Sequence, residues 1–452
     1  MTKRLIAFAL LAATTAPEAP SAPISPPVRP ADSEPPVSYT VRTGDNLYDL
    51  AQHYMRRLGD YRIVQKLNRV RDPRRLPIAR TLLIPRALLK SDPLEAKVIA
   101  FRGSTSINDK PVALGMTLGE GGRIRTGANS FLSIALADGS TITLPSQSTI
   151  RIERLRRLRL TGEMERLFRL DDGRSQTEVT PRTNGRDRFE IRTPISVAAV
   201  RGTDFRVAVL DGGKAATTEV LDGHVGLAGG GAQATLEPGL GARVTAQGTT
   251  GPIKLLSPPD ILDPERTQSD PDLVFRLAPL EHAEHYRVQI AKDAGFLDIV
   301  EEALVDRPEA NLPSVPNGDW FVRVTGIDAN QLEGLPRVVS FERYLNALRA
   351  AAEPLPGKRR FLFKWQGLGE GKHLYRFVIA RVDLPDRPVI DEPALTERSF
   401  VATDLPPGDY IWRVETRSVD NGKTHSNWSN PQTLTVAGKT KQTKTRAKPP
   451  AS

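Results

Sequence analysis

"YTVRTGDNLYDLAQHY", residues 39–54, contains the pattern of a strand, a tight turn and the start of a helix. Val41 lies in the strand, and Gly44-Asp45 form the turn that ends it. Asn46, with Asp49 three residues later, is a candidate cap for the helix. Apolar residues then recur at the i, i+3, i+4 and i+7 spacing of an amphipathic helix, at Leu47, Leu50, Ala51 and Tyr54. The stretch therefore predicts a β-strand that turns directly into a short helix.

The residues that follow complete a small unit. Gly59-Asp60 opens a second helix, whose apolar positions are Ile63, Val64 and Leu67. Asp72-Pro73 turns the chain, and "TLLIP" at 81–85 is a closing strand. The predicted order over residues 38–86 is βααβ. Because a unit of this size buries little surface, its two strands must pair with each other.

These motifs, in this order, resemble the LysM module. The resemblance rests on the opening stretch, "LN" at 67–68, "DP" at 72–73 and "LLIP" at 82–85. The LysM family binds glycans that contain N-acetylglucosamine, and in bacteria this glycan is peptidoglycan. The sequence departs from the family at Ile78-Ala79-Arg80, where Pro-Gly-Gln is usual, and this puts bulkier residues beside the expected groove.

The resemblance also implies a glycan site. In the family, the first loop and the loop before the last strand form a shallow groove, in which sugar amides bond to loop backbone and apolar side chains contact the N-acetyl methyl group. The residues that the resemblance assigns to this site are Gly44, Asp45, Asn46 and Leu47 from the first loop, and Pro73, Leu76, Pro77, Ile78 and Ala79 from the second. A purely structural alternative is that the first turn only ends a strand and caps a helix.

Composition favours several β-rich modules. A chain of 452 residues is too long for one ordinary core, and its 37 prolines and 35 glycines favour β-modules joined by linkers. A formal charge of +10 suits acidic partners such as nucleic acid, anionic lipid or an anionic wall polymer. Since the chain has no cysteine, its modules must be held by their own cores and not by disulfides.

The first residues follow the layout of a secretory signal peptide. A basic start at Lys3-Arg4 precedes a short apolar run, Leu5 to Ala13, so residues 1–22 are expected to direct export to the periplasm or cell envelope. Residues 23–37 are a Pro-rich linker. No later window approaches a membrane span, so no transmembrane segment is expected after signal cleavage.

Residues 95–247 alternate with period 2 and contain several Gly turns, which predicts an all-β domain, either a sandwich or a coiled β-stack. Leu132, Ile134 and Leu136 precede a turn at Asp138-Gly139, and Ile142 and Leu144 return. The segment is similar to the FecR family through "RTG" at 125–127, the hairpin at 136–144 and "VRGTDFRV" at 200–207.

The remaining sequence contains an internal repeat. "HYRVQIA" at 285–291 recurs as "LYRFVIA" at 374–380, and "PNGDWFVRV" at 316–324 recurs as "PPGDYIWRV" at 406–414. The offset of about 90 residues is a usual size for an immunoglobulin-like or fibronectin type III-like β-sandwich. Two such sandwiches are expected, at 260–343 and 355–437, followed by a basic disordered tail at 438–452.

A search for catalytic and metal-binding chemistry favours structural interpretations. No nucleophile elbow or metalloprotease motif is present, and His282 with His285 suit a polar turn better than a metal site. The acidic pairs Glu163/Glu165 and Asp171/Asp172 are interpreted as solvated loop charge. "RIERLRRLRL" at 151–160 is interpreted as an element with its leucines inside and a solvated arginine face, with phosphate binding as the alternative.

The sequence therefore predicts a multidomain, predominantly β protein without enzymatic activity, catalytic residues, metal or cofactor. Its expected function is to bind peptidoglycan glycan strands through LysM in the cell envelope, with the FecR-like domain and the sandwiches as a scaffold for envelope proteins. Nucleic acid is not an expected partner. The alternative is a periplasmic sensory partner of FecR type in transporter or sigma-factor signalling, although the FecR family's own route needs a membrane span that the sequence lacks.

Overall fold

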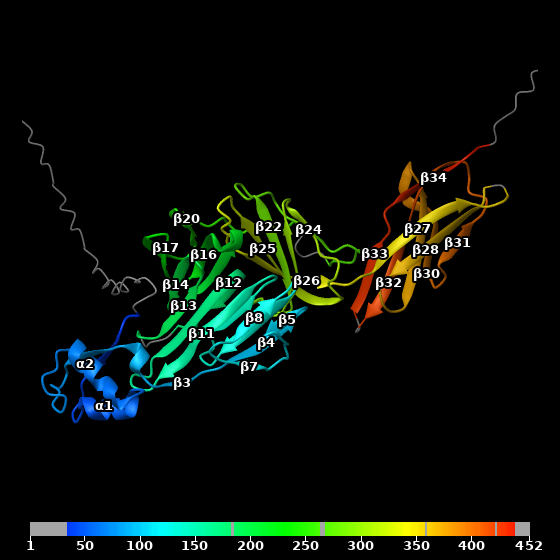
Figure 1. The fold of residues 1–452 in the computed structure, drawn as a ribbon. Helices are drawn as coiled ribbons and strands as arrows, with labels where there is room; N and C mark the ends of the chain where they lie inside the picture. Colours follow the sequence, from blue (N-terminus) through cyan, green and yellow to red (C-terminus); the bar gives the residue numbers. More distant parts are fainter. Residues whose placement is uncertain (1–33, 182–184, 263–266, 358, 421–422, 439–452) are drawn as a thin grey trace, which may run out of the picture.

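The computed structural model describes residues 34–181, 185–262, 267–357, 359–420 and 423–438. Within these ranges the modules follow one another along an elongated molecule, from the helices at one end to the last sandwich at the other (Figure 1). The predicted signal peptide and nearly all of the predicted linker and tail lie outside the described residues. The α-helices of the described part are eight and seven residues long, and no described helix has the length and apolar character that a membrane crossing requires.

The N-terminal module, residues 34–90, has the predicted βααβ order. Its elements are β1 (Val37–Thr40), α1 (Leu47–Tyr54), η1 (Leu58–Asp60), α2 (Tyr61–Leu67), β2 (Thr81–Ile84) and η2 (Arg86–Leu88). β1 pairs with β2 in antiparallel register, with Val37 opposite Ile84. The Asn46 side chain accepts a hydrogen bond from the backbone N–H of Asp49 at 2.9 Å, which confirms the predicted cap.

The core of this module includes a residue from the next one. Leu158, which is fully buried, packs in the cluster formed by Leu47, Leu50, Leu82 and Ile84. Two backbone bonds continue the connection, from Lys90 N–H to the Tyr54 carbonyl and from Arg159 N–H to the Lys90 carbonyl. The N-terminal module is therefore built into its neighbour, with no flexible tether between them.

The central module, residues 91–254, is all-β, as predicted. Its strands are β3 (Ser91–Pro93), β4 (Ala96–Arg102), β5 (Thr105–Ile107), β6 (Lys110–Pro111), β7 (Thr117–Leu118), β8 (Arg123–Thr126), β9 (Phe131–Leu136), β10 (Thr141–Leu144), β11 (Thr149–Leu158), β12 (Met164–Glu178), β13 (Arg188–Arg192), β14 (Ser196–Val200), β15 (Asp204–Leu210), β16 (Ala215–Asp222), β17 (Val225–Gly229), β18 (Ala232–Leu236), β19 (Leu240–Thr245) and β20 (Gly248–Lys254). The predicted hairpin is β9–β10, in which Leu132 lies opposite Leu144 and Ile134 opposite Ile142. All four side chains are buried in one continuous apolar core.

Strand β12 belongs to both sheets of the central module. Its first half pairs with β11 and β13, and its second half, from Gly173 onward, pairs with β15. Gly173 has a φ of +76°, and a Cβ there would lie 2.4 Å from the Gln147 carbonyl oxygen and 2.6 Å from Ser148 Cα. Only glycine fits such a backbone approach, so Gly173 is the point at which the strand passes from one sheet to the other.

Two β-sandwiches follow, as the internal repeat predicted. The first contains β21 (Val274–Arg276), β22 (His285–Ala291), β23 (Ile299–Val305), β24 (Glu309–Asn311), β25 (Gly318–Ile327) and β26 (Arg337–Arg343). The second contains β27 (Ala347–Pro354), β28 (Phe361–Leu368), β29 (His373–Arg381), β30 (Leu384–Leu395), β31 (Ser399–Ala402), β32 (Gly408–Asp420), β33 (Lys423–Trp428) and β34 (Gln432–Val436). The repeated sequences form equivalent pairs, β22 with β25 and β29 with β32.

The repeat extends to one hydrogen bond. Trp320 Nε1 donates to the Pro316 carbonyl at 3.0 Å, and Tyr410 hydroxyl donates to the Pro406 carbonyl at 2.8 Å. In each sandwich the aromatic residue lies four residues after the proline, across the Gly-Asp turn. The polar end of a buried ring is therefore satisfied in the same way in both copies.

Two expectations about charged residues need correction. Glu163 and Glu165 are not solvated loop charges: their side chains are 2% and 0% exposed, and both pair with Arg86. On β11 the leucines Leu155 and Leu158 are buried as expected, but the arginine face is only partly solvated, because Arg156 is 9% exposed and contacts Glu165 at 2.7 Å. Buried carboxylates require such partners, because an unpaired charge in the interior is costly.

Candidate glycan-binding site

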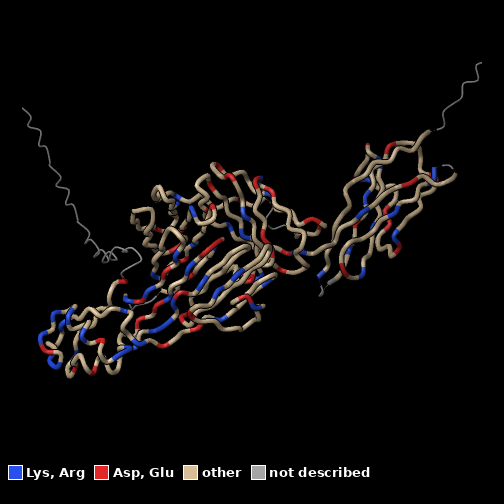
Figure 2. Tube along the Cα trace, viewed as in Figure 1, with Lys and Arg blue, Asp and Glu red and all other residues tan. Residues whose placement is uncertain are grey.

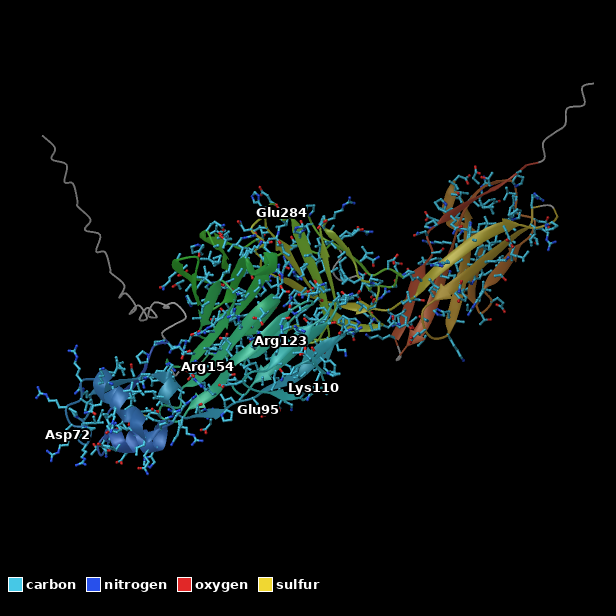
Figure 3. All side chains as sticks on the ribbon, viewed as in Figure 1. Asp72, Glu95, Lys110, Arg123, Arg154 and Glu284 are labelled. Atoms are coloured by element: carbon cyan, nitrogen blue, oxygen red, sulfur yellow. The ribbon has the colours of Figure 1, made fainter. Side chains whose placement is uncertain are left out.

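Two loops of the N-terminal module meet at the outer end of the molecule. The first follows β1 and leads into α1, and the second leads into β2. Asp72, which begins the second loop, lies at the end of the structure away from the sandwiches (Figure 3). The backbone N–H of Leu47 donates to the Pro73 carbonyl at 2.9 Å, and that of Ala79 donates to the Val41 carbonyl at 2.9 Å. These bonds hold the two predicted halves of the site side by side.

The polar side chains of the first loop shape the loop itself. One oxygen of the Asp45 carboxylate accepts from the Arg42 backbone N–H at 2.7 Å and from the Tyr39 hydroxyl at 2.7 Å. Burial, together with the Asp45 contact, raises the pKa of Tyr39 to about 12, so this hydroxyl stays a donor at neutral pH. Asn46 caps α1. The side chains of Asp45 and Asn46 therefore serve mainly to hold the backbone of the first loop in place.

Exposed apolar surface comes from the second loop. Ile78 is 64% exposed, whereas Leu47 is completely buried. Pro77 and Ala79 are exposed, and Pro73 and Leu76 are half-buried. Of the predicted site residues, Leu47 therefore offers no side chain to a ligand and contributes through its N–H bond to Pro73, while Ile78 and Pro77 offer side-chain contact.

Backbone donors lie beside this apolar surface. Among the described residues, the N–H groups of Gly44, Asn46 and Ile78 have no hydrogen-bond partner. Unpaired backbone groups at the surface are solvated, and a ligand with amide or hydroxyl oxygens can replace that water. The combination of free N–H groups and exposed aliphatic surface suits a sugar with an N-acetyl group.

Ala79 occupies the position at which the family usually has glycine. Its φ is +64°, in the left-handed region that glycine adopts without cost. The next residue, Arg80, turns back along the module, where its guanidinium Nη2 bonds the Asn68 carbonyl at 2.5 Å. The loop thus keeps the glycine-type backbone, although its sequence departs from the family pattern.

An aromatic pair beside the first loop was not predicted. Tyr48 on α1 and Tyr61 on α2 have ring centroids 4.4 Å apart, and their hydroxyls lie 3.3 Å from each other. Both rings are half-buried, and Tyr48 directly follows Leu47. The signal in the sequence was an aromatic residue just off the apolar stripe of α1, which periodicity alone assigns to solvent.

Positive charge is concentrated in the same module. Residues 38–86 carry eleven Lys and Arg against four Asp and Glu. Figure 2 shows these basic residues around the outer end of the molecule, where the two loops lie. An anionic polymer would therefore be attracted to the end that bears the candidate site.

The comparisons with known proteins agree with this organisation. The LysM domain family model matches residues 39–85, and the FecR protein family model matches residues 122–226. No curated protein matches the chain. Both families consist generally of binding or regulatory domains and are typical of envelope proteins.

Solved structures show more distant likenesses. A candidate anti-sigma factor from Parabacteroides distasonis is 20% identical over 27% of this chain and 54% of its own, with a TM-score of 0.24. The chain thus spans about half the length of that protein. A two-domain fibronectin type III segment of chicken tenascin is 12% identical over 39% of this chain and 99% of its own, with a TM-score of 0.19. Fibronectin III-like modules of Clostridium thermocellum CbhA are 10% identical over 39% of this chain and 90% of their own, with a TM-score of 0.18.

The two family matches fall on separate modules. Residues 39–85 coincide with the βααβ unit, and residues 122–226 lie within the all-β central module. The chain is therefore a multidomain, predominantly β protein with a LysM domain at residues 39–85, a FecR domain at residues 122–226 and two β-sandwiches after them.

Proposed function

We propose that this protein is a non-catalytic component of the bacterial cell envelope that binds the N-acetylglucosamine glycan of peptidoglycan. The observation that carries the proposal is the pair of loops in the LysM domain, where unpaired N–H groups of Gly44, Asn46 and Ile78 adjoin the exposed Ile78 side chain. The nine predicted residues act unequally. Gly44 and Asn46 offer backbone N–H groups, Asp45 and Leu47 hold the loops in place, and the residues of the second loop supply apolar contact.

The FecR domain and the sandwiches have a scaffolding role in this proposal. They continue from the LysM domain without a flexible joint and project away from the glycan end (Figure 1). Envelope proteins are the expected partners of these domains. Export through the N-terminal segment, to the periplasm or envelope, belongs to the same proposal.

Retention on purified peptidoglycan tests the function. The full chain is the correct reagent, because Leu158 of the FecR domain completes the LysM core. Ile78→Asp should weaken retention about tenfold, since it removes the largest exposed apolar contact of the second loop. Leu58→Asp is the matched control: Leu58 is 55% exposed and lies beyond the C-terminal end of α1, whose N-terminal end adjoins the loops.

A competition arm identifies the ligand class. Soluble oligomers of N-acetylglucosamine should release the chain from peptidoglycan, whereas glucose oligomers of the same linkage, which lack the N-acetyl group, should not. Equal retention of wild type and Ile78→Asp, or release by both oligomers alike, would reject the proposed site.

The FecR match supports a second candidate, a regulatory role in envelope signalling. It predicts that the protein co-purifies with an outer-membrane transporter or its regulator. A variant that loses this partner should still be retained on peptidoglycan as strongly as wild type. If no transporter or regulator is recovered under conditions that preserve known complexes, only the scaffold role is supported.

A further inference from the structure

The FecR domain and the first sandwich are joined face to face. Phe131 of β9 packs with Ala291, Phe296 and Ile299 of the first sandwich in a small apolar cluster. The Ser133 hydroxyl donates to the Leu297 carbonyl at 2.6 Å across the same contact. Beside this cluster the interface, here called the seam, is lined mainly by polar and charged side chains that are largely buried.

The seam contains a partly open cavity of about 30 Å³, room for about two or three water molecules. One wall comes from the FecR domain and the other from the first sandwich. The charged groups that line the cavity are four guanidinium groups and one carboxylate, namely Arg174, Arg206, Arg287, Arg323 and Glu333. The cavity is thus rich in hydrogen-bond donors and positive charge.

The single lining carboxylate is already fully used. Glu333 accepts from Arg206 at 2.9 Å, from Arg287 at 3.1 Å and from the Thr325 hydroxyl at 2.9 Å. Arg287 has a second acidic partner outside the cavity lining, Glu302, at 3.0 Å. These contacts use both oxygens of Glu333 and leave little acceptor capacity for the other two arginines, while the Nε of Arg206 also has no hydrogen-bond partner within the described residues.

Arg323 is buried without a carboxylate partner. Its guanidinium bonds the side-chain oxygens of Gln289 at 2.6 Å and Gln176 at 2.7 Å, and among the described residues no carboxylate oxygen lies within 4.0 Å of it. Burial lowers the pKa of Arg323 to about 10, which leaves it charged at neutral pH. Its guanidinium also lies 4.3 Å from the centroid of the Phe296 ring. A buried cation with amide and ring partners but no carboxylate favours an anionic ligand.

Arg174 and Ser175 have free donors at the same cavity. Arg174 reaches Glu333 only through Nη1, at 3.4 Å, and its Nε and Nη2 have no partner among the described residues. The Ser175 hydroxyl is buried and makes no hydrogen bond. A buried hydroxyl without a partner has a free-energy cost, which a bound acceptor would remove.

Two further acidic residues, Glu219 and Asp204, lie near the arginines, and burial raises the pKa of both carboxyl groups. Within the described residues neither forms an ion pair with Arg174 or Arg323.

We propose that the seam cavity is a binding site for a small inorganic oxyanion of the phosphate or sulfate class, held by Arg174, Arg323 and the Ser175 hydroxyl. Arginine offers planar, charged donors that suit such oxyanions. A cavity of about 30 Å³ matches the scale of a small free anion, so the proposed ligand is the inorganic ion itself. Because Arg174 and Ser175 come from β12 and Arg323 from β25, a bound anion would connect the two domains.

Calorimetric titration of the full chain with sodium phosphate and sodium sulfate, against sodium chloride at equal ionic strength, tests the site. Wild type should bind one oxyanion saturably, and the temperature of unfolding should rise with ligand concentration. Arg174→Gln should weaken binding about tenfold or more, because it removes charge-assisted hydrogen bonds. Ser175→Ala removes one donor at almost constant volume and should weaken binding roughly fivefold.

The matched control is Arg151→Gln, which lies in the same domain but is 46% exposed and paired with Asp171. The affinity of this control for phosphate and sulfate should equal that of wild type. Retention on peptidoglycan should be unchanged in Arg174→Gln, Ser175→Ala and Arg151→Gln. If Arg174→Gln fails to fold, as judged by circular dichroism, Ser175→Ala decides the result. Equal responses to chloride and oxyanions, or unchanged binding in folded Arg174→Gln or in Ser175→Ala, would overturn the proposal.

Discussion

Arg86 of the LysM domain and Glu165 of β12 form an ion pair with a nitrogen–oxygen distance of 3.0 Å, and the Glu165 side chain is completely buried. Arg156 contacts the other oxygen of the same carboxylate at 2.7 Å. Burial alone would raise the pKa of Glu165, but the two guanidinium groups outweigh it, so the pKa is lowered. The junction between the two domains is therefore a dry, charge-paired contact.

Glu165→Gln should lower the free energy of unfolding of the protein by about 3 kcal/mol, because it leaves the buried guanidinium groups of this junction without their shared carboxylate. Chemical denaturation measures the loss. Glu309→Gln is the matched control, since Glu309 is 58% exposed in its pair with Arg276, and its effect should stay below about 0.5 kcal/mol. Similar effects for the two variants would show that the junction does not depend on this carboxylate.

Ala79→Gly should stabilise the LysM domain by about 1 kcal/mol, because Ala79 has a φ of +64° that only glycine adopts freely. Slower amide hydrogen exchange at Leu82 in β2 would report the gain. Ala51→Gly provides the opposite case, since Ala51 lies in α1, where glycine costs about 1 kcal/mol. Destabilisation by both substitutions would contradict the interpretation of the Ala79 backbone.

Gly173→Ala should be far more costly than Gly162→Ala. Both glycines have a positive φ, +76° and +71°, but a Cβ at Gly173 would meet Gln147 and Ser148 backbone, whereas one at Gly162 meets open space. We expect a loss of about 3 kcal/mol or more for Gly173→Ala, and about 1 kcal/mol for Gly162→Ala. Scanning calorimetry gives both values, and equal losses would mean that the approach at Gly173 relaxes without cost.

Retention on peptidoglycan should fall as salt rises. The LysM domain is strongly basic, and screening shortens the reach of its charges from about 8 Å at 0.15 M salt to about 3 Å at 1 M. As salt rises, the difference in retention between wild type and Ile78→Asp should become smaller but should not vanish, because salt does not screen the apolar contact of Ile78. Retention that is independent of salt would show that charge contributes nothing to binding.

Protonation of Glu333 at low pH should destabilise the contact between the FecR domain and the first sandwich. Burial would raise the pKa of this carboxyl, but Arg206, Arg287 and the other lining arginines hold it far below its ordinary value of 4.5. A carboxyl whose pKa is lower in the folded state contributes stability that is complete above the ordinary value and is lost as the pH falls toward the folded value. Below pH 4.5, wild type should therefore lose stability more steeply than Glu333→Gln.

Scanning calorimetry of the full chain from about pH 7 to pH 3 measures this difference, as the slope of unfolding free energy against pH for each protein. Between pH 7 and pH 5 the ionisation of Glu333 should change the unfolding free energy of wild type very little. This holds whatever the absolute stability of the variant. Parallel pH profiles for the two proteins would exclude Glu333 as the group responsible.

The fold was predictable where the signal is local. The helix stripe from Leu47, the hairpin at Asp138-Gly139 and the repeat at 285–291 and 374–380 each depend on residues close in sequence, and the structure confirms all three. The burial of Glu163 and Glu165 was not predictable in this way. Arg86, the partner of Glu165, lies 79 residues earlier, and only the tertiary fold brings the two together.

The candidate site was predictable in part. Resemblance located both loops, and the structure places them side by side through Leu47 and Pro73. The resemblance assigned Leu47 and Ile78 to the same site, but it does not show which side chains face solvent, and Leu47 is buried while Ile78 is exposed. The seam cavity had no sequence signal, because Arg206 and Glu333 are 127 residues apart.

Strand β12 gives the molecule a mechanical axis. Near its first residue, Glu165 holds the LysM domain, and near its last, Arg174 and Gln176 contact the first sandwich. A pull between the cell wall and a partner on the sandwiches would thus load this strand lengthwise between Glu165 and Gln176, over roughly 36 Å. Its neighbours β11, β13 and β15 would then resist in shear, with many hydrogen bonds loaded together, so tension would reach the far domain before the strand gives way.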